Sequence, residues 1–308
     1  MYRKEFIMHR HVTNPIITPL DFPDADAVFN CGQTMFNGKT LLLLSVCPRE
    51  GRPCMHIATS SDGVKFDIEP EPFITPLTDG PLACLDEWAI DPRITRIDDT
   101  YYIVRPAYSC SALLEKTTDW KTRETIDCIA LPGNRVPCLF PEKIDGRYFI
   151  INRMSFGANS ELWISSSSDL VDWGRHRLIQ GTGTPYSVVW ANLKIGPTPP
   201  VKTPDGWLVI IHGVIPYAGG SRYSLGAIML DLKNPSRMIG KSSGWILTPD
   251  EPYEFMGNCQ NTIFSCGCIA EPEKDLIRIY YGAADTCIGL ASGKLSELIA
   301  DCMKNRIP

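Results

Sequence analysis

Five short turns, each followed at once by an apolar, strand-like segment, constrain the fold of this 308-residue chain more than any other feature. Asn-Gly and Asp-Gly turns between apolar segments are the strongest short-range signal of a β-hairpin, because both residues tolerate positive φ. The segments that follow the turns are residues 39–46, 100–107, 147–154, 207–214 and 276–283. The turns end at positions 38, 99, 146, 206 and 275, which gives spacings of 61, 47, 60 and 69 residues. Repeats of this length hold four short strands.

A second pattern recurs with the same repeat, after each of these hairpins. A strand of small residues leads into a turn with Ser or Thr and Asp at 58–63, 116–120 and 165–170, with weaker copies at 230–232 and 290–293. The two patterns together predict an all-β fold, a five-bladed β-propeller, as a single catalytic domain over residues 1–308. An all-β sandwich or barrel with chance hairpin regularity is the alternative. A short C-terminal helix is expected over residues 294–303.

Composition excludes several classes of function. The net charge is −5 and the pI is near 5.6, so no basic surface for nucleic acid is expected. No stretch reaches the roughly 18 apolar residues of a membrane helix, and residues 1–10 lack the apolar core of a signal peptide. The twelve cysteines lack zinc-site spacing and are expected to be reduced thiols. We therefore expect a cytoplasmic protein without a bound metal; whether it forms a homo-oligomer is left open.

Chemistry on a propeller is expected to be spread over several blades, because the blades meet at one axis. Asp91, directly before a proline, reads alone as a turn initiator or as a partner of a nearby Arg. Arg153 and His212 are interpreted as strand-end residues, and a lone His in such a place is more often structural. Together with Arg135 and Lys194 they would form a local anion site, most simply for phosphate.

Short motifs in a fixed order relate these residues to a known family. They are the segments at 14–17, 91–94, 139–144, 194–196, 199–200, 206–208, 212–214 and 280–285. In order and spacing the chain resembles glycoside hydrolase family 130, the β-mannoside phosphorylases and their hydrolase relatives, which are built on a five-bladed propeller.

The resemblance implies roles for individual residues. Asp91 matches the catalytic acid, which protonates the glycosidic oxygen through the mannosyl 3-hydroxyl. The family's phosphate-binding set is matched by Arg135, Arg153, Lys194 and His212. Candidates for substrate binding are Asp285, which matches an acid that holds sugar hydroxyls, and Asn30, Ser45, Asn134 and Tyr223.

The expected reaction is inverting phosphorolysis of a β-1,4- or β-1,2-linked mannoside to α-D-mannose 1-phosphate and the shortened acceptor sugar. Inorganic phosphate would be a co-substrate, and no cofactor is expected. An inverting hydrolase needs a second carboxylate as a base, whereas phosphate is already an anionic nucleophile. The alternatives are hydrolysis on the same fold, a non-catalytic carbohydrate-binding propeller, and an arabinanase-like hydrolase that uses Asp26, Asp91 and Glu142.

Two positions depart from the family pattern. Ile90 precedes Asp91 where members commonly carry Glu, and Ser45 stands where many carry a substrate-contacting Arg. Arg49 or Arg52 is expected to replace that Arg. Both departures concern the choice of sugar rather than the reaction.

Overall fold

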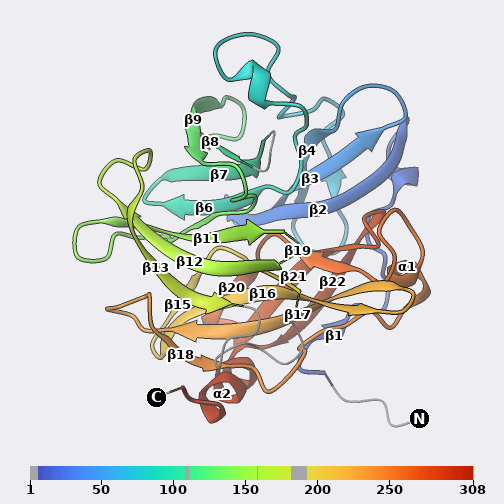
Figure 1. Ribbon diagram of the computed structural model, residues 1–308. Helices are drawn as coiled ribbons and strands as arrows, with labels where there is room; N and C mark the ends of the chain where they lie inside the picture. Colours follow the sequence, from blue (N-terminus) through green and yellow to red (C-terminus); the bar gives the residue numbers. More distant parts are fainter. Residues whose placement is uncertain (1–5, 108–110, 158, 182–192, 308) are drawn as a thin grey trace.

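The computed structural model describes residues 6–107, 111–157, 159–181 and 193–307, and these form five antiparallel sheets arranged as a five-bladed propeller. Figure 1 shows the sheets following one another in sequence order, from the blue and teal strands of blades 1 and 2 to the orange and red strands of blade 5. The predicted propeller is therefore confirmed, and the sandwich alternative is wrong.

Blades 1 to 3 each contain four strands that are consecutive in sequence. Blade 1 is β2 (Ala25–Phe36), β3 (Lys39–Pro48), β4 (Cys54–Ser60) and β5 (Asp67–Ile68). Blade 2 is β6 (Arg93–Ile97), β7 (Thr100–Pro106), β8 (Ala112–Thr117) and β9 (Glu124–Ala130). Blade 3 is β10 (Cys138–Leu139), β11 (Tyr148–Phe156), β12 (Asn159–Ser167) and β13 (Gly174–Gly181).

Blades 4 and 5 carry additional short strands. Blade 4 is β14 (Lys194–Pro197), β16 (Gly206–Tyr217), β17 (Gly220–Leu230) and β18 (Met238–Lys241), with β15 (Val201–Thr203) also paired to β16. Blade 5 is β19 (Ile263–Ser265), β21 (Leu276–Ala283) and β22 (Cys287–Lys294), with β20 (Ile269–Glu271) paired to β21. The N-terminal β1 (His9–Arg10) pairs with β22 and so completes the last blade from the start of the chain.

The five predicted turns each precede the second strand of a blade. Four of the five place an Asn or Asp at the positive φ that the sequence indicated: 49° at Asn37, 53° at Asp98, 48° at Asp145 and 48° at Asp275. Asp and Asn adopt this left-handed conformation more readily than other non-glycine residues. The turn chemistry therefore fixes the register of each inner hairpin.

Apolar clusters fill each interface between neighbouring blades. In β3, Leu41 and Leu43 pack toward blade 2, whereas Leu42 and Leu44 pack toward blade 5. All four are at most 1% exposed. Successive side chains of a strand point to opposite faces, so a blade covered on both sides needs an uninterrupted apolar run. Truncating any one of these leucines to Ala is expected to cost about 2–5 kcal/mol.

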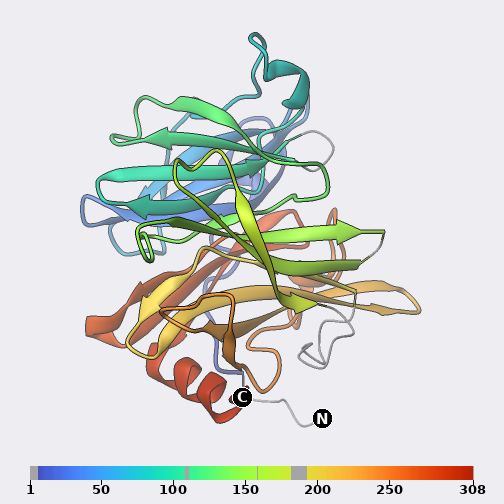
Figure 2. The ribbon, with the colours of Figure 1, turned by 60° about the vertical axis from the view of Figure 1, so that its left-hand side comes forward.

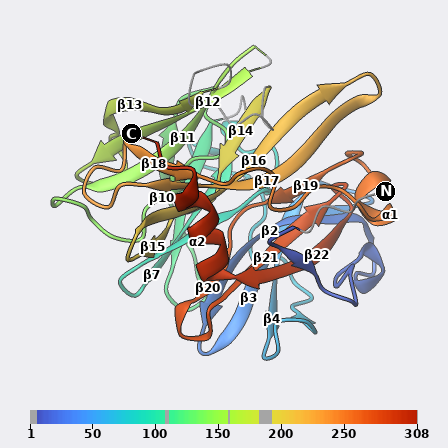
Figure 3. The same ribbon diagram turned by 90° about the horizontal axis from the view of Figure 1, so that it is seen from below.

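The predicted C-terminal helix is confirmed as α2 (Leu295–Lys304). Its buried side chains Leu295, Leu298 and Cys302 are spaced as one helical face and join the cluster between blades 4 and 5. Figure 2 shows α2 at the lower edge of the molecule, and Figure 3, seen from below, shows it in front of the strands; its contacts are with β17, β18 and β22 of these two blades.

The other helices are short. They are α1 (Pro252–Phe255) and the 3-10 turns η1 (Pro19–Asp21), η2 (Ala83–Leu85) and η4 (Pro272–Lys274). None of the helices in the described ranges has the length or the apolar character needed to span a bilayer.

Candidate functional site

Asp91 lies two residues before β6, and hydrogen bonds hold its backbone and its side chain. Its backbone has φ 52°, in the left-handed region, although the next residue is Pro92, which normally favours extended backbone. The hydroxyl of Ser45 accepts the Asp91 N–H at 2.9 Å and donates to the carbonyl of Asn30 at 3.0 Å. Side chains in uncommon backbone conformations are often found at functional sites because the surrounding structure must hold them there.

Two acids, the buried Asp91 and the half-buried Asp285, share one amide donor. Asn30 Nδ2 donates to Asp91 Oδ1 at 2.9 Å and to Asp285 Oδ1 at 3.2 Å. Burial, followed by the nearby charge of Asp91, raises the pKa of Asp285 to about 6, although Asn30 and Arg135 act in the opposite direction. The pair is therefore a place where a carboxyl group retains its proton well above the usual pH range.

Two arginines of blade 3 bring positive charge to these acids. The Nη2 atom of Arg135 is 3.6 Å from Asp91 Oδ2, and the Arg135 side chain is 36% exposed. Arg153 is buried, and its Nε has no hydrogen-bond partner within the described part of the chain. Burial and the neighbouring charge of Arg135 lower the pKa of Arg153 to about 10. A buried guanidinium with an unfilled donor is suited to binding an anion.

Blade 4 contributes His212, Lys194 and Tyr223. His212 is 1% exposed, and neither of its ring nitrogens has a partner among the described residues. Burial and the charges of surrounding cations, Lys194 among them, hold the pKa of His212 well below its ordinary value, so the ring is neutral. The ring centroid of Tyr223 lies 6.1 Å from that of His212, and that of Phe264 lies at 4.5 Å.

The structure brings together all ten residues that the sequence singled out. Asn134 joins the others because its Oδ1 accepts the backbone N–H of Arg153 at 3.0 Å. Every blade supplies at least one member, as expected for a site at a propeller axis. The ten are Asn30, Ser45, Asp91, Asn134, Arg135, Arg153, Lys194, His212, Tyr223 and Asp285.

Two details of the prediction were wrong. Arg153 and His212 are not strand-end residues, because β11 continues to Phe156 and β16 continues to Tyr217. The strands of the hairpins β11–β12 and β16–β17 remain paired beyond their apolar residues. The outer parts of these strands are polar, so the sequence did not predict that the strands extend so far. Both side chains therefore sit within rigid ladders rather than at loose ends.

Arg49 and Arg52, the two residues expected to replace the substrate-contacting Arg, contact other groups in the structure. Arg49 Nε is 3.5 Å from Asp26 Oδ1 at the surface, and its side chain is 66% exposed. Arg52 donates to the backbone carbonyl of Asp86 at 3.1 Å. The expectation that one of them replaces a substrate-contacting Arg has no support in these contacts.

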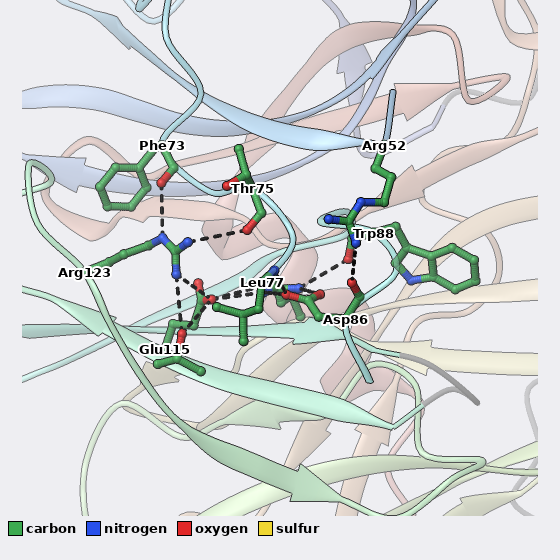
Figure 4. Close-up of polar contacts among 10 residues, drawn as sticks. Arg52, Phe73, Thr75, Leu77, Asp86, Trp88, Glu115 and Arg123 are labelled. Carbon is green, nitrogen blue, oxygen red and sulfur yellow. Dashed lines mark hydrogen bonds and ion pairs between the residues drawn. The ribbon is translucent and has the colours of Figure 1, made fainter. Parts of the chain in front are cut away.

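A network of buried charges anchors the segment that leads into Asp91 (Figure 4). Arg105 in β7 donates to the two carboxylate oxygens of Asp86 at 2.5 and 2.7 Å and to Glu115 at 3.1 Å. The side chains of all three residues are fully buried. Arg123 adds a second cation at 3.1 Å from Glu115, so two positive charges face two negative ones.

The same network closes a loop between blades 1 and 2. Asp86 Oδ2 accepts the backbone N–H of Leu77 at 2.7 Å, which joins the two ends of the loop over residues 77–86. Arg105 also donates to the carbonyl of Trp88 at 3.2 Å, three residues before Asp91. The position of Asp91 is thus tied to a rigid, charge-balanced core element.

A cavity of about 1040 Å³ lies beside the site, between blades 2 and 3. Its walls include Trp163, Trp173 and Asn152, and Asn134 is the member of the ten predicted residues that borders it. Asp91 does not line it, so the cavity adjoins the cluster of acids and cations rather than containing it.

Sequence reasoning assigned no role to three residues that shape the site. Arg93 is fully buried and donates to the carbonyl of Asp91 at 2.6 Å. A side chain at Gly196 would collide with the ring of His212, and one at Gly282 would collide with Asn30. The motifs at 91–94, 194–196 and 280–285 contained these residues, but a one-dimensional pattern does not reveal what a backbone approaches.

Comparison with known proteins gives consistent results. A family model described as β-1,4-mannooligosaccharide phosphorylase, that of glycoside hydrolase family 130, matches residues 23–305. The β-1,4-mannooligosaccharide phosphorylase of Ruminococcus albus is 30% identical over 309 residues, covering 95% of this chain and 90% of that protein. A β-1,2-mannobiose phosphorylase of Thermoanaerobacter sp. is 36% identical over 245 residues, covering 76% and 74%.

A solved structure is similar over nearly the whole chain. The β-1,2-mannobiose phosphorylase of Listeria innocua, in complex with β-1,2-mannobiose, superimposes with a TM-score of 0.86 at 28% sequence identity. The match covers 97% of this chain and 99% of that one.

Proposed function

Because the chain belongs to glycoside hydrolase family 130, we propose that it is an enzyme that phosphorolyses β-mannosides, releasing α-D-mannose 1-phosphate with inversion. The observation that carries this proposal is the group of cationic side chains gathered beside the two acids Asp91 and Asp285. Arg135 contacts Asp91 directly, and Arg153 and Lys194 lie close enough to influence the neighbouring His212.

The charges favour phosphate as the nucleophile. Arg135 contacts Asp91, and Arg153, Lys194 and Arg93 all lie near His212, whereas the site holds two acids, of which Asp285 retains its proton up to about pH 6. The excess positive charge in a protein of net charge −5 suits a phosphate dianion. The neutral His212 can donate a hydrogen bond to phosphate without adding charge.

The reaction assigns one step to each group. A phosphate oxygen attacks the anomeric carbon while the bond from that carbon to the glycosidic oxygen breaks. Asp91 supplies the proton that the leaving oxygen takes up, by way of the mannosyl 3-hydroxyl. The carboxylate that remains on Asp91 is stabilised by Arg135 and Asn30, which already contact it. Asp285 would hold sugar hydroxyls, together with Asn30, Asn134 and Tyr223, whereas Ser45 would act by holding the backbone of Asp91, because its hydroxyl is already bonded to Asp91 and Asn30.

Replacing a proposed phosphate ligand tests the nucleophile. Arg153→Ala is expected to raise the phosphate KM about tenfold or more, since a hydrogen bond between charged groups contributes about 1.5–3 kcal/mol. The matched control is Arg147→Ala, which removes a cation that precedes the same strand and contacts Ser166 instead. Equal phosphate KM values for the two variants would contradict the assignment.

The linkage is tested by running the reaction in reverse. The enzyme is supplied with α-D-mannose 1-phosphate and a panel of acceptors, including mannose, glucose, and β-1,2- and β-1,4-mannobiose. The disaccharide or trisaccharide formed identifies the linkage by NMR. We propose that a β-1,2- or β-1,4-linked product forms; the absence of product with every acceptor would contradict the proposed function.

We also propose that the enzyme works in the cytoplasm. The eleven described cysteines are free thiols, and several of them, such as Cys31 and Cys266, are buried in the core. Unpaired cysteines in this number are typical of a reducing compartment.

A further inference from the structure

Arg93 is the most completely enclosed cation of the site and forms no ion pair with a carboxylate in the described ranges. It begins β6, is 0% exposed, and its Nη1 donates to the carbonyl oxygen of Asp91 at 2.6 Å. Its Nε and Nη2 have no hydrogen-bond partner within the described residues. Buried arginines are usually paired with an acid. Arg105, in the neighbouring strand β7, is paired in this way with Asp86.

The carbonyl that Arg93 holds belongs to a residue with an unfavourable backbone. Asp91 has φ 52° although a proline follows it, so the surrounding contacts must maintain its conformation. Ser45 fixes the N–H of Asp91 and Arg93 fixes its carbonyl, from two different blades. Together they clamp the peptide groups on both sides of the Asp91 side chain.

The guanidinium also lies close to the proposed phosphate-binding residues. Its Cζ is 5.3 Å from the ring centroid of Phe264, and the ring centroid of His212 is 4.5 Å from the same phenylalanine, with the two rings tilted by 37°. The charge of Arg93 is among the causes that lower the pKa of both His212 and Arg153. The thiols next to it, Cys138 and Cys266, are neutral, because burial raises the pKa of each far above neutrality.

We propose that Arg93 is a positioning residue for phosphorolysis: it holds the backbone of Asp91 in its left-handed conformation and places a positive charge without an ion-pair partner beside the phosphate site. The inference rests on the proposed function and extends it to a residue that does not touch substrate. The several N–H donors of the guanidinium hold the backbone of Asp91, and its positive charge acts on the phosphate site.

Two substitutions separate these parts. Arg93→Lys keeps the charge but loses the fork, so kcat is expected to fall about tenfold or more while the phosphate Kd stays within about threefold. Arg93→Met removes both, so kcat falls at least as far and the phosphate Kd also rises about tenfold. The Kd is measured by calorimetry with inorganic phosphate alone, and kcat by release of mannose 1-phosphate.

The matched control is Arg278→Met, another mostly buried arginine, which pairs with Glu271 in blade 5. It is expected to lower the unfolding temperature without changing kcat or the phosphate Kd. If Arg93→Met does not fold, the kcat of Arg93→Lys tests the proposal, which predicts a fall of about tenfold or more. Wild-type kcat and Kd in a folded Arg93 variant, or equal losses in Arg278→Met, would overturn the proposal. A wild-type protein without phosphorolysis would instead refute the proposed function, and the phosphate Kd values would still test Arg93.

Discussion

Replacing Asp285 by Asn should make the protein more stable at neutral pH while removing activity. The pKa of Asp285 is raised from 3.8 to about 6, because the carboxyl is buried beside Asp91. At about 1.4 kcal/mol per pH unit, ionising it in the folded protein costs about 3 kcal/mol above pH 6. An amide has no such cost, and it can still accept the hydrogen bond from Asn30.

The sign follows from linkage. The folded state binds the proton of Asp285 more tightly than the unfolded state, so this carboxyl lowers stability progressively as pH rises from about 4 to 6. Asp285→Asn should therefore match the wild type near pH 4 and exceed it by about 1–3 kcal/mol at pH 7.5, allowing for relaxation of the site. Urea unfolding at a series of pH values measures this difference directly.

A surface acid provides the control with the opposite sign. Three hydrogen bonds, from the backbone N–H groups of Lys65 and Val64 and from Ser60, lower the pKa of Asp62 to about 2. Asp62→Asn should therefore lose stability at neutral pH, and the loss should disappear as pH falls through about 4 to 2. A stability difference for Asp285→Asn that does not change with pH would refute the reasoning about the buried pair.

Two further predictions concern the surroundings of the site. Arg105→Met leaves the acids Asp86 and Glu115 buried without their shared cation. The free energy of unfolding, measured with urea, is therefore expected to fall by about 3–5 kcal/mol. A loss below about 1 kcal/mol would show that the network is not a single unit. Gly196→Ala places a methyl group against the buried ring of His212, which must shift to make room, and should both raise the phosphate KM and lower the unfolding temperature. An unchanged KM would show that the ring position is unimportant.

The architecture was predictable because the chain repeats its turns. Asn37, Asp98, Asp145 and Asp275 each adopt positive φ before the second strand of a blade. Turns of this kind can be predicted from a sequence, since their conformation depends on the turn residue and its immediate neighbours. The apolar strands that follow, and the small buried face of α2, can be predicted for the same reason.

For contacts between blades, the sequence predicted only that polar residues of several blades meet near the axis, and not which atoms contact each other. Asn30 and Asp285 are 255 residues apart and meet because the first and fifth blades are neighbours in the ring. Arg93 was overlooked because its partner is a backbone carbonyl, which leaves no trace in residue types. The lengths of β11 and β16 were underestimated because pairing, rather than apolarity, extends them.

The central claim is that phosphate, rather than water, attacks the mannoside. The most direct measurement follows β-1,2- and β-1,4-mannobiose by NMR, with and without inorganic phosphate, using wild-type protein and the Asp91→Asn variant. The account predicts α-D-mannose 1-phosphate from the wild type only when phosphate is present, and no product from the folded variant. Release of free mannose at the same rate without phosphate, or normal turnover by Asp91→Asn, would contradict it.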